Sequence, residues 1–248
     1  MIRVCTVLLV LFTEFVKAQD IHYSQFDQTK SLTNPALIFN QTEDYQIQLQ
    51  RRSQWASVTT PFNTFSLSFN AKNIYKTFAA GTTILNDKAG DSHFLTKGVI
   101  FSLANSVFNS KGNVLSIGLQ GSFYQRTINY DGLSFLEPEY FQISKVNFFD
   151  IGLGLSNYKE LADKSAFLLG ASVYHLNRPR QSFLLDRQVF LFPKYIVHSV
   201  YYVDLNSKIN FSPAFYFSSQ SQDNELILSL IHISEPTRPE RISYAVFC

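Results

Sequence analysis

The side chains that could bind a metal or act as nucleophiles are few and far apart in this 248-residue chain. The histidines share no HExxH spacing and have no neighbouring cysteine, the arrangements that hold zinc. They are His22, His93, His175, His198 and His232. The two cysteines, Cys5 and Cys248, stand near the two ends, so neither a disulfide framework nor a zinc ribbon is expected between them. The sequence predicts no metal, no cofactor and no catalytic residues.

A glycine pair near the middle of the chain is the next candidate for chemistry. Gly152 and Gly154 form a Gly-x-Gly pair that lacks the third glycine and the following helix of a dinucleotide-binding loop. The pair instead predicts close packing between strands. The sequence contains no GxSxG motif, the turn that carries the nucleophile of many hydrolases. The chain is therefore expected to be non-enzymatic.

Alternation with a period of two dominates residues 44 to 227. In YQIQLQ, Tyr45, Ile47 and Leu49 fall on one face, and the glutamines between them fall on the other, as successive strand side chains must. The stretches FNTFSLSFN and VLSIGLQGSFY repeat the pattern. Segments rich in Asn, Asp and Gly, such as NDKAG, separate such stretches at hairpin spacing. We predict an all-β chain with about nine antiparallel strands.

The composition favours a membrane barrel over a soluble sheet. The polar strand faces carry Gln, Ser, Thr and Asn, which suit a wet or plugged lumen. Charged residues are 16% of the chain, against roughly 25% in an ordinary soluble domain. We predict an antiparallel transmembrane β-barrel of the outer membrane, with Asp150 and Glu160 as lumen or rim charges. A net charge of +2 gives no indication of nucleic acid binding.

Aromatic residues make up 15% of the chain and recur near the expected strand ends. Barrels place such residues in girdles at the two membrane interfaces. The candidates for these girdles are Trp55, Phe62, Phe123, Tyr124, Tyr158, Tyr174, Phe192, Tyr195 and Tyr216.

The two ends of the chain are expected to lie outside the barrel. Residues 1–18 combine Arg3, an apolar run and small residues before Gln19, as a secretory signal peptide does. Residues 19–43 are polar and form a periplasmic or lumenal N-terminal segment, in which Pro35 marks a boundary before the first strand. Residues 228–248 resemble translated sequencing-adapter DNA, so we expect a non-native tail and an incomplete barrel over 44–227.

Several motifs occur in the order of one known family. They are QDIHYSQF followed by NPAL, Arg52 with Gln54 and Trp55, LNDKAG, FFDIGLGLSNY, LLGASVYHLNRP and SPAFYFSSQ. Over residues 19 to 227 the chain resembles the PorP/SprF proteins of the type IX secretion system of Bacteroidota. The positions that carry this resemblance, and that we take as structural candidates, are Asn34, Pro35, Arg52, Trp55, Asp150, Gly152, Gly154, His175, Asn177 and Pro179. His175 is expected to anchor a turn with Asn177 and Arg178.

The resemblance implies an outer-membrane component that assists the export or surface delivery of proteins with C-terminal sorting domains, such as adhesins. It also implies a link to gliding motility. The expected partners are outer-membrane lipid, periplasmic ring or peptidoglycan-linked subunits of the secretion system, and the sorting-domain proteins. Two alternatives stay open, namely a diffusion porin and a soluble secreted β-sandwich adhesin.

Overall fold

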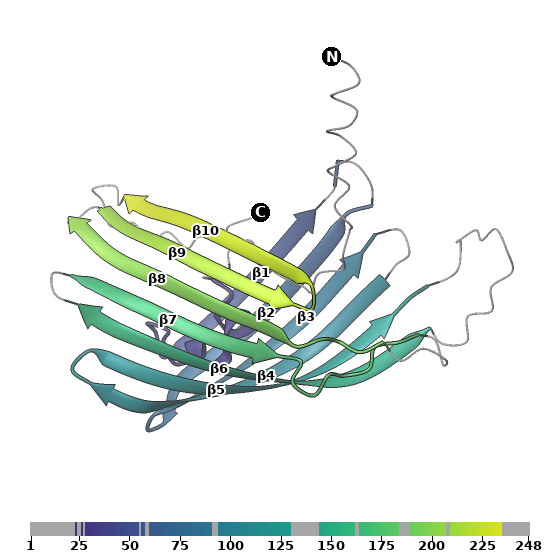
Figure 1. Ribbon diagram of the computed structural model, residues 1–248, viewed down its shortest axis with the longest axis horizontal. Coiled ribbons are helices and arrows are strands. Elements are labelled where there is room, and N and C mark those ends of the chain that lie inside the picture. Colours follow the sequence, from purple (N-terminus) through teal and green to yellow (C-terminus); the bar gives the residue numbers. More distant parts are fainter. Residues whose placement is uncertain are drawn as a thin grey trace, which may run out of the picture.

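The computed structural model places a single antiparallel sheet around a short N-terminal segment (Figure 1). The residues that it describes are 23, 26, 28–54, 56–57, 60–90, 94–129, 144–161, 164–183, 189–206 and 209–234. The signal peptide predicted for residues 1–18 and the girdle candidate Trp55 lie outside them. Within the described residues, no helix has the length and apolar character needed to cross a membrane.

Ten strands follow one another in the sheet in chain order, and each pairs antiparallel with the next. Their bounds are β1 (Tyr45–Gln54), β2 (Phe62–Tyr75), β3 (Phe78–Ala89), β4 (Phe94–Ser110), β5 (Asn113–Thr127), β6 (Lys145–Leu161), β7 (Ser165–Tyr174), β8 (Lys194–Asn206), β9 (Ile209–Gln220) and β10 (Asp223–Ser234). The sheet curls into half of a barrel, and β1 and β10 each have one strand neighbour (Figure 1). The prediction of an incomplete antiparallel barrel is confirmed.

The strand count differs from the prediction, because ten strands form where about nine were expected. The additional strand, β10, pairs with β9 from Asp223 opposite Gln220 to Ser234 opposite Ile209. It therefore includes residues 228–234 of the expected non-native tail. Leu226, Leu228 and Leu230 continue the period of two, and this pattern is enough to extend the sheet. The origin of residues 228–248 stays a prediction.

The alternation of side chains along each strand determines which of them lie on the concave face of the sheet. On β2, Phe65, Leu67 and Phe69 are 38 to 43% exposed on the convex face, while Ser66 and Ser68 between them are buried. Serines recur in the same way on the concave side of the longer strands. Those that are at most 2% exposed are Ser66, Ser102, Ser116, Ser122 and Ser156. The sheet thus has an apolar outer face and a polar inner face.

The same alternation corrects the predicted aromatic girdles. Phe123 and Tyr195 are 52% and 59% exposed on the outer face, as a girdle requires. Tyr174 and Tyr216 are buried in the curl, at 7% and 4% exposure. Position near a strand end does not make an aromatic residue part of a girdle, because successive side chains point to opposite faces of the sheet.

The connections differ in length at the two ends of the strands. At one end the turns β2–β3, β4–β5 and β8–β9 have two residues each, and β6–β7 has three. Left-handed backbone at Lys76, Lys111 and Gly112 closes two of these turns, as tight hairpins require. At the other end the β5–β6 connection spans 128–144 and the β7–β8 connection spans 175–193. We call these two ends the short-turn end and the long-connection end.

The segment before β1 lies in the concave side of the sheet, where Figure 1 shows it as purple coils. It contains the helical turn α2 (Lys30–Thr33) and the 3-10 turn η1 (Pro35–Ile38), and we call residues 28–43 the inner segment. Leu37 packs with Leu168, Val200 and other buried residues of β7 to β9, and Ile38 packs with Ala79 and Ala104 of β3 and β4. The apolar core of the protein is thus a contact between the inner segment and the sheet.

Candidate functional site

Asn34 is the point where the inner segment is fastened to the sheet. Its side chain is 0% exposed. The Oδ1 atom accepts a hydrogen bond of 2.9 Å from the N–H of Ala36, which caps η1, while Pro35 occupies the first position of that turn. The Nδ2 atom donates to the carbonyl oxygens of Leu155 at 2.9 Å and Ala171 at 3.1 Å. One side chain thus caps the start of η1 and bridges β6 and β7.

His198 completes the surroundings of Asn34 from β8. Its Nε2 atom lies 3.1 Å from Asn34 Nδ2, and the side chain is 1% exposed. The amide nitrogen carries two hydrogens and has three acceptors within reach, so His198 shares a donor of Asn34 with the strand carbonyls.

Glycines make room for this approach. A Cβ atom at Gly154 would overlap the side chains of Asn34 and Pro35, and one at Gly118 would overlap the backbone of Pro35 and Ala36. The close packing predicted for Gly154 thus occurs against the inner segment, where the sequence had suggested a neighbouring strand. Gly152, the other member of the pair, is covered by the ring of Tyr174.

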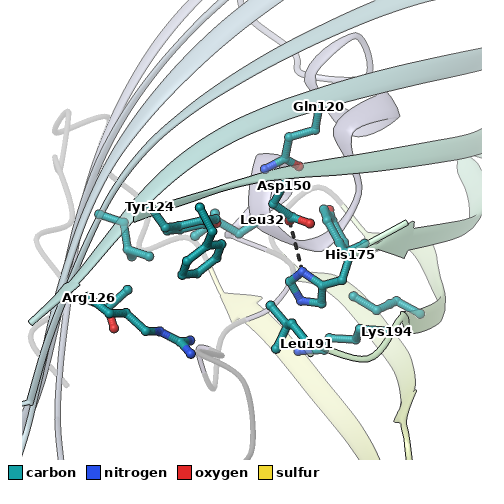
Figure 2. Close-up of a pocket in the computed structure, with 13 residues that line it drawn as sticks. Leu32, Gln120, Tyr124, Arg126, Asp150, His175, Leu191 and Lys194 are labelled. Carbon is teal, nitrogen blue, oxygen red and sulfur yellow. Dashed lines mark ion pairs between the residues drawn. The ribbon is translucent and has the colours of Figure 1, made fainter. Parts of the chain in front are cut away.

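Asp150 and His175 form a second buried cluster, nearer the long-connection end. His175 Nδ1 lies 3.0 Å from Asp150 Oδ2, and the side chains of His175 and Asp150 are 6% and 3% exposed (Figure 2). His175 has a φ of +59°, a left-handed conformation that turns the chain after β7. The carboxylate on β6 thus holds the first residue of the β7–β8 connection.

Asn177 also binds the β7–β8 connection to β6, through the backbone of that strand. Its Nδ2 donates to the carbonyl oxygen of Phe149 at 2.6 Å, and its Oδ1 accepts from the N–H of Ile151 at 3.2 Å. The N–H of Arg178 donates to the carbonyl oxygen of His175 at 3.0 Å. These contacts have the form of the turn that the sequence predicts for this motif.

Arg52 and Pro179 are the remaining predicted site residues that the structure describes. Arg52 is half-buried on β1, opposite Thr64 of β2. Pro179 lies within the β7–β8 connection, where its carbonyl oxygen accepts from the N–H of Leu191 at 2.9 Å. Trp55 falls outside the described residues.

The cavities in the described part of the structure include one towards each end of the strands. The cavity towards the long-connection end measures about 60 Å³ and contains Asp150 and His175 in its wall (Figure 2). We call it the upper cavity. The cavity towards the short-turn end measures about 710 Å³ and is lined by Lys72, Asn109 and Glu160 together with apolar residues of the inner segment. We call it the lower cavity.

Burial perturbs one ionisable group of the N-terminal segment. Tyr23 is 7% exposed, and the loss of water around its hydroxyl raises the pKa to about 12. The phenol therefore stays neutral at any physiological pH.

Sequence comparison decides the family. The family model described as "Type IX secretion system membrane protein PorP/SprF" matches residues 15–235, which is most of the chain. The chain belongs to the PorP/SprF family. The match includes the inner segment and all ten strands, and it extends one residue beyond β10. No curated protein and no solved structure matches this PorP/SprF protein.

Sequence reasoning found part of the site of this PorP/SprF protein and missed the rest. Asn34, Pro35 and Gly154 come together, as do Asp150 and His175. The residues that were missed are Gly118, Gln120, Arg126, Lys194 and His198. For His198 and Gln120 the alternation of strand side chains could have indicated the inner face, but no sequence signal pairs them with their neighbours.

Proposed function

We propose that this PorP/SprF protein is a non-enzymatic component of the outer membrane that assists the surface delivery of proteins with C-terminal sorting domains. Adhesins, including those used in gliding motility, are the cargo that fits this role best. Membership of a family of type IX secretion system membrane proteins is the observation that carries the proposal. That membership also implies contact with other components of the secretion system.

The two faces of the sheet support a location in a membrane. Large apolar side chains are exposed along the whole convex face, including Phe101 at 62% and Leu103 at 55%. A soluble protein rarely exposes a continuous apolar surface of this kind, whereas hydrocarbon requires it. The buried serines on the other face suit a polar barrel interior.

The lengths of the connections support an orientation in that membrane. Outer-membrane barrels have short turns on the periplasmic side and longer loops outside the cell. Applied here, this rule places the lower cavity towards the periplasm and the upper cavity towards the cell exterior. The lower cavity is then in the place where periplasmic subunits of the machinery could dock.

The inner segment favours an adaptor over a diffusion porin. Asn34 and the apolar contacts of Leu37 and Ile38 fasten this segment inside the curl. A porin needs a clear aqueous lumen. An adaptor instead needs fixed surfaces at its two ends, and a fastened inner segment stabilises both.

The proposal is tested in a strain that lacks the gene. We expect a sorting-domain adhesin to be made in normal amounts but to lose its accessibility to protease added outside intact cells. Expression of the wild-type protein restores the accessibility. A variant with Asn34→Ala, which frees the inner segment, restores much less.

Normal surface display of every sorting-domain protein in the deletion strain would contradict the proposal. Conductance in planar bilayers from the wild-type protein, at the level of an open channel, would favour the porin instead. Recovery of the protein from the culture medium, with none in the detergent-extracted membrane, would favour the soluble adhesin.

A further inference from the structure

The upper cavity has the properties of a small-molecule site. Its walls come from the ends of β3 to β8 that face the long connections, and from Leu32 of the inner segment. Polar side chains converge on it from different strands, as Figure 2 shows for Gln120 and Arg126 of β5, Asp150 of β6 and Lys194 of β8. Convergent polar groups in a concavity are typical of ligand sites.

Lys194 supplies an uncompensated positive charge. The residue as a whole is 7% exposed, which is unusual for lysine. Among the described residues no carboxylate forms an ion pair with it, and the one carboxylate of this cavity, Asp150, is bound to His175. The guanidinium group of Arg126 is already engaged, since it lies over the rings of Phe94 and Phe148 at 5.8 and 5.3 Å. An anionic group is the natural complement of this wall.

Two acceptor atoms in the same cavity require a hydrogen-bond donor. Gln120 is 3% exposed and Asp150 is 2% exposed. Gln120 Oε1 and Asp150 Oδ1 have no hydrogen-bond partner among the residues that the structure describes. A buried acceptor without a donor costs about 1–3 kcal/mol, so a ligand that donates to both is favoured.

The volume limits the size of the ligand. One water-sized group needs about 10–15 Å³ of cavity, so the ~60 Å³ here accept about four to six such groups. This is the size of one glycine. We propose that the upper cavity binds a small amino-carboxylate, whose carboxylate contacts Lys194 and whose N–H groups donate to Gln120 and Asp150. A free amino acid and the C-terminal residue of a peptide both present this chemistry. The assignment does not rest on the role in secretion.

The test is isothermal titration calorimetry with the full-length protein purified in detergent. We expect glycine to bind at least about tenfold more tightly than acetate, which lacks the donors, and than methylammonium, which lacks the carboxylate. N-acetylglycine distinguishes the two sources. If it binds as well as glycine, the ligand is a peptide C-terminus, and if it binds much more weakly, the ligand is a free amino acid.

Three variants locate the site. Lys194→Gln is expected to weaken glycine binding about tenfold or more, while Lys194→Arg, which keeps the charge, retains most of it. Gln120→Met removes an acceptor at similar volume, so it reduces the preference for glycine over acetate. Lys97→Gln is the matched control, because Lys97 is exposed on β4 outside the cavity. The shift in gel mobility between heated and unheated samples verifies that each variant is folded.

Three results would overturn the inference. Absence of binding by glycine and by N-acetylglycine at millimolar concentration would mean that the cavity holds only water. Equal binding of acetate and glycine would remove the role of the two acceptors. Binding that Lys194→Gln and Lys97→Gln change to the same extent would place the ligand elsewhere.

Discussion

The two cavities of this protein share one sheet and differ in almost everything else. The upper cavity measures about 60 Å³ and has buried polar atoms without partners in its wall. The lower cavity measures about 710 Å³, and its charged groups lie near the strand ends, with Lys72 donating to the carbonyl oxygen of Gln41. The polar inner face is continuous across both. We therefore attribute the difference in size and lining between the two cavities to the inner segment, which lies between the two ends of the curl.

This comparison shows that the polar residues of the barrel wall do not by themselves determine the properties of a cavity. The residues that lie inside the curl also contribute. Small polar residues, mainly serine, recur at inward positions of β2, β4 and β5, so these strands present a wall of similar chemistry. The inner segment lines both cavities, with Leu32 in the wall of the upper cavity and eight of its residues in the wall of the lower cavity. Removal or weakening of the inner segment should make the two ends alike.

The largest effect is expected from Asn34→Ala. The change removes the cap of η1 and the hydrogen bonds to the carbonyl oxygens of Leu155 and Ala171, each of which contributes about 0.5–1.5 kcal/mol. We expect a loss of about 3–4 kcal/mol in the free energy of unfolding and conductance in planar bilayers as the cavities join. Asn105→Ala is the control, since the bond that it removes, from Thr77, is exposed. An unchanged unfolding midpoint would show that Asn34 does not fasten the segment.

A smaller effect is expected from Gly154→Ala. The added methyl group overlaps Asn34 and Pro35, so the inner segment must move away from β6 at a cost of about 2–3 kcal/mol. Circular dichroism during urea unfolding measures this loss. Gly121→Ala is the matched control on β5, because its Cβ would meet Phe149 at an ordinary 3.4 Å. Equal effects of the two variants would contradict a specific fit at Gly154.

The next prediction concerns the pH dependence of stability that the buried hydroxyl group of Tyr23 causes. Tyr23 has a pKa of about 12 in the folded protein and about 10 when unfolded. The unfolded chain therefore loses this proton first as the pH rises. The stability that Tyr23 contributes is complete below pH 10 and decreases by about 2 kcal/mol by pH 12.

Tyr23→Phe has no phenol to ionise, and its unfolding is measured beside the wild type from pH 9 to 12. We expect the variant to lose less stability over this range. Parallel curves for the two proteins would show that the hydroxyl of Tyr23 is hydrated.

The smallest effect concerns the pair in the upper cavity. A double-mutant cycle with Asp150→Asn and His175→Asn should give a coupling free energy of about 1 kcal/mol. Asparagine tolerates the left-handed backbone at position 175, so the cycle isolates the ion pair. Asp204→Asn on the exposed part of β8 is the control for charge removal. A coupling near zero would mean that the pair does not stabilise the cavity wall.

The strands and their faces could be read from the sequence because strand side chains alternate with a period of two. This local rule placed Phe65 outside and Ser66 inside and located nine of the ten strands. It missed β10, which pairs with β9 from Asp223 to Ser234, because residues 228–248 had been set aside on their unusual composition. Pro35 was expected at a boundary before the first strand, and the structure places it at the start of η1, ahead of β1. Each of these predictions depends on neighbours in the chain.

The contacts between the inner segment and the sheet could be seen only in the tertiary structure. Asn34 meets β6, β7 and β8 across 121 to 164 residues of sequence, and no local pattern records such a contact. Lys194 of β8 and Gln120 of β5 likewise line one cavity only because β6 and β7, which lie between their strands, pair in a particular register. The physical reason is that the face on which a side chain lies follows from its position in its own strand. Which side chains meet across the lumen depends on the curvature of the whole sheet.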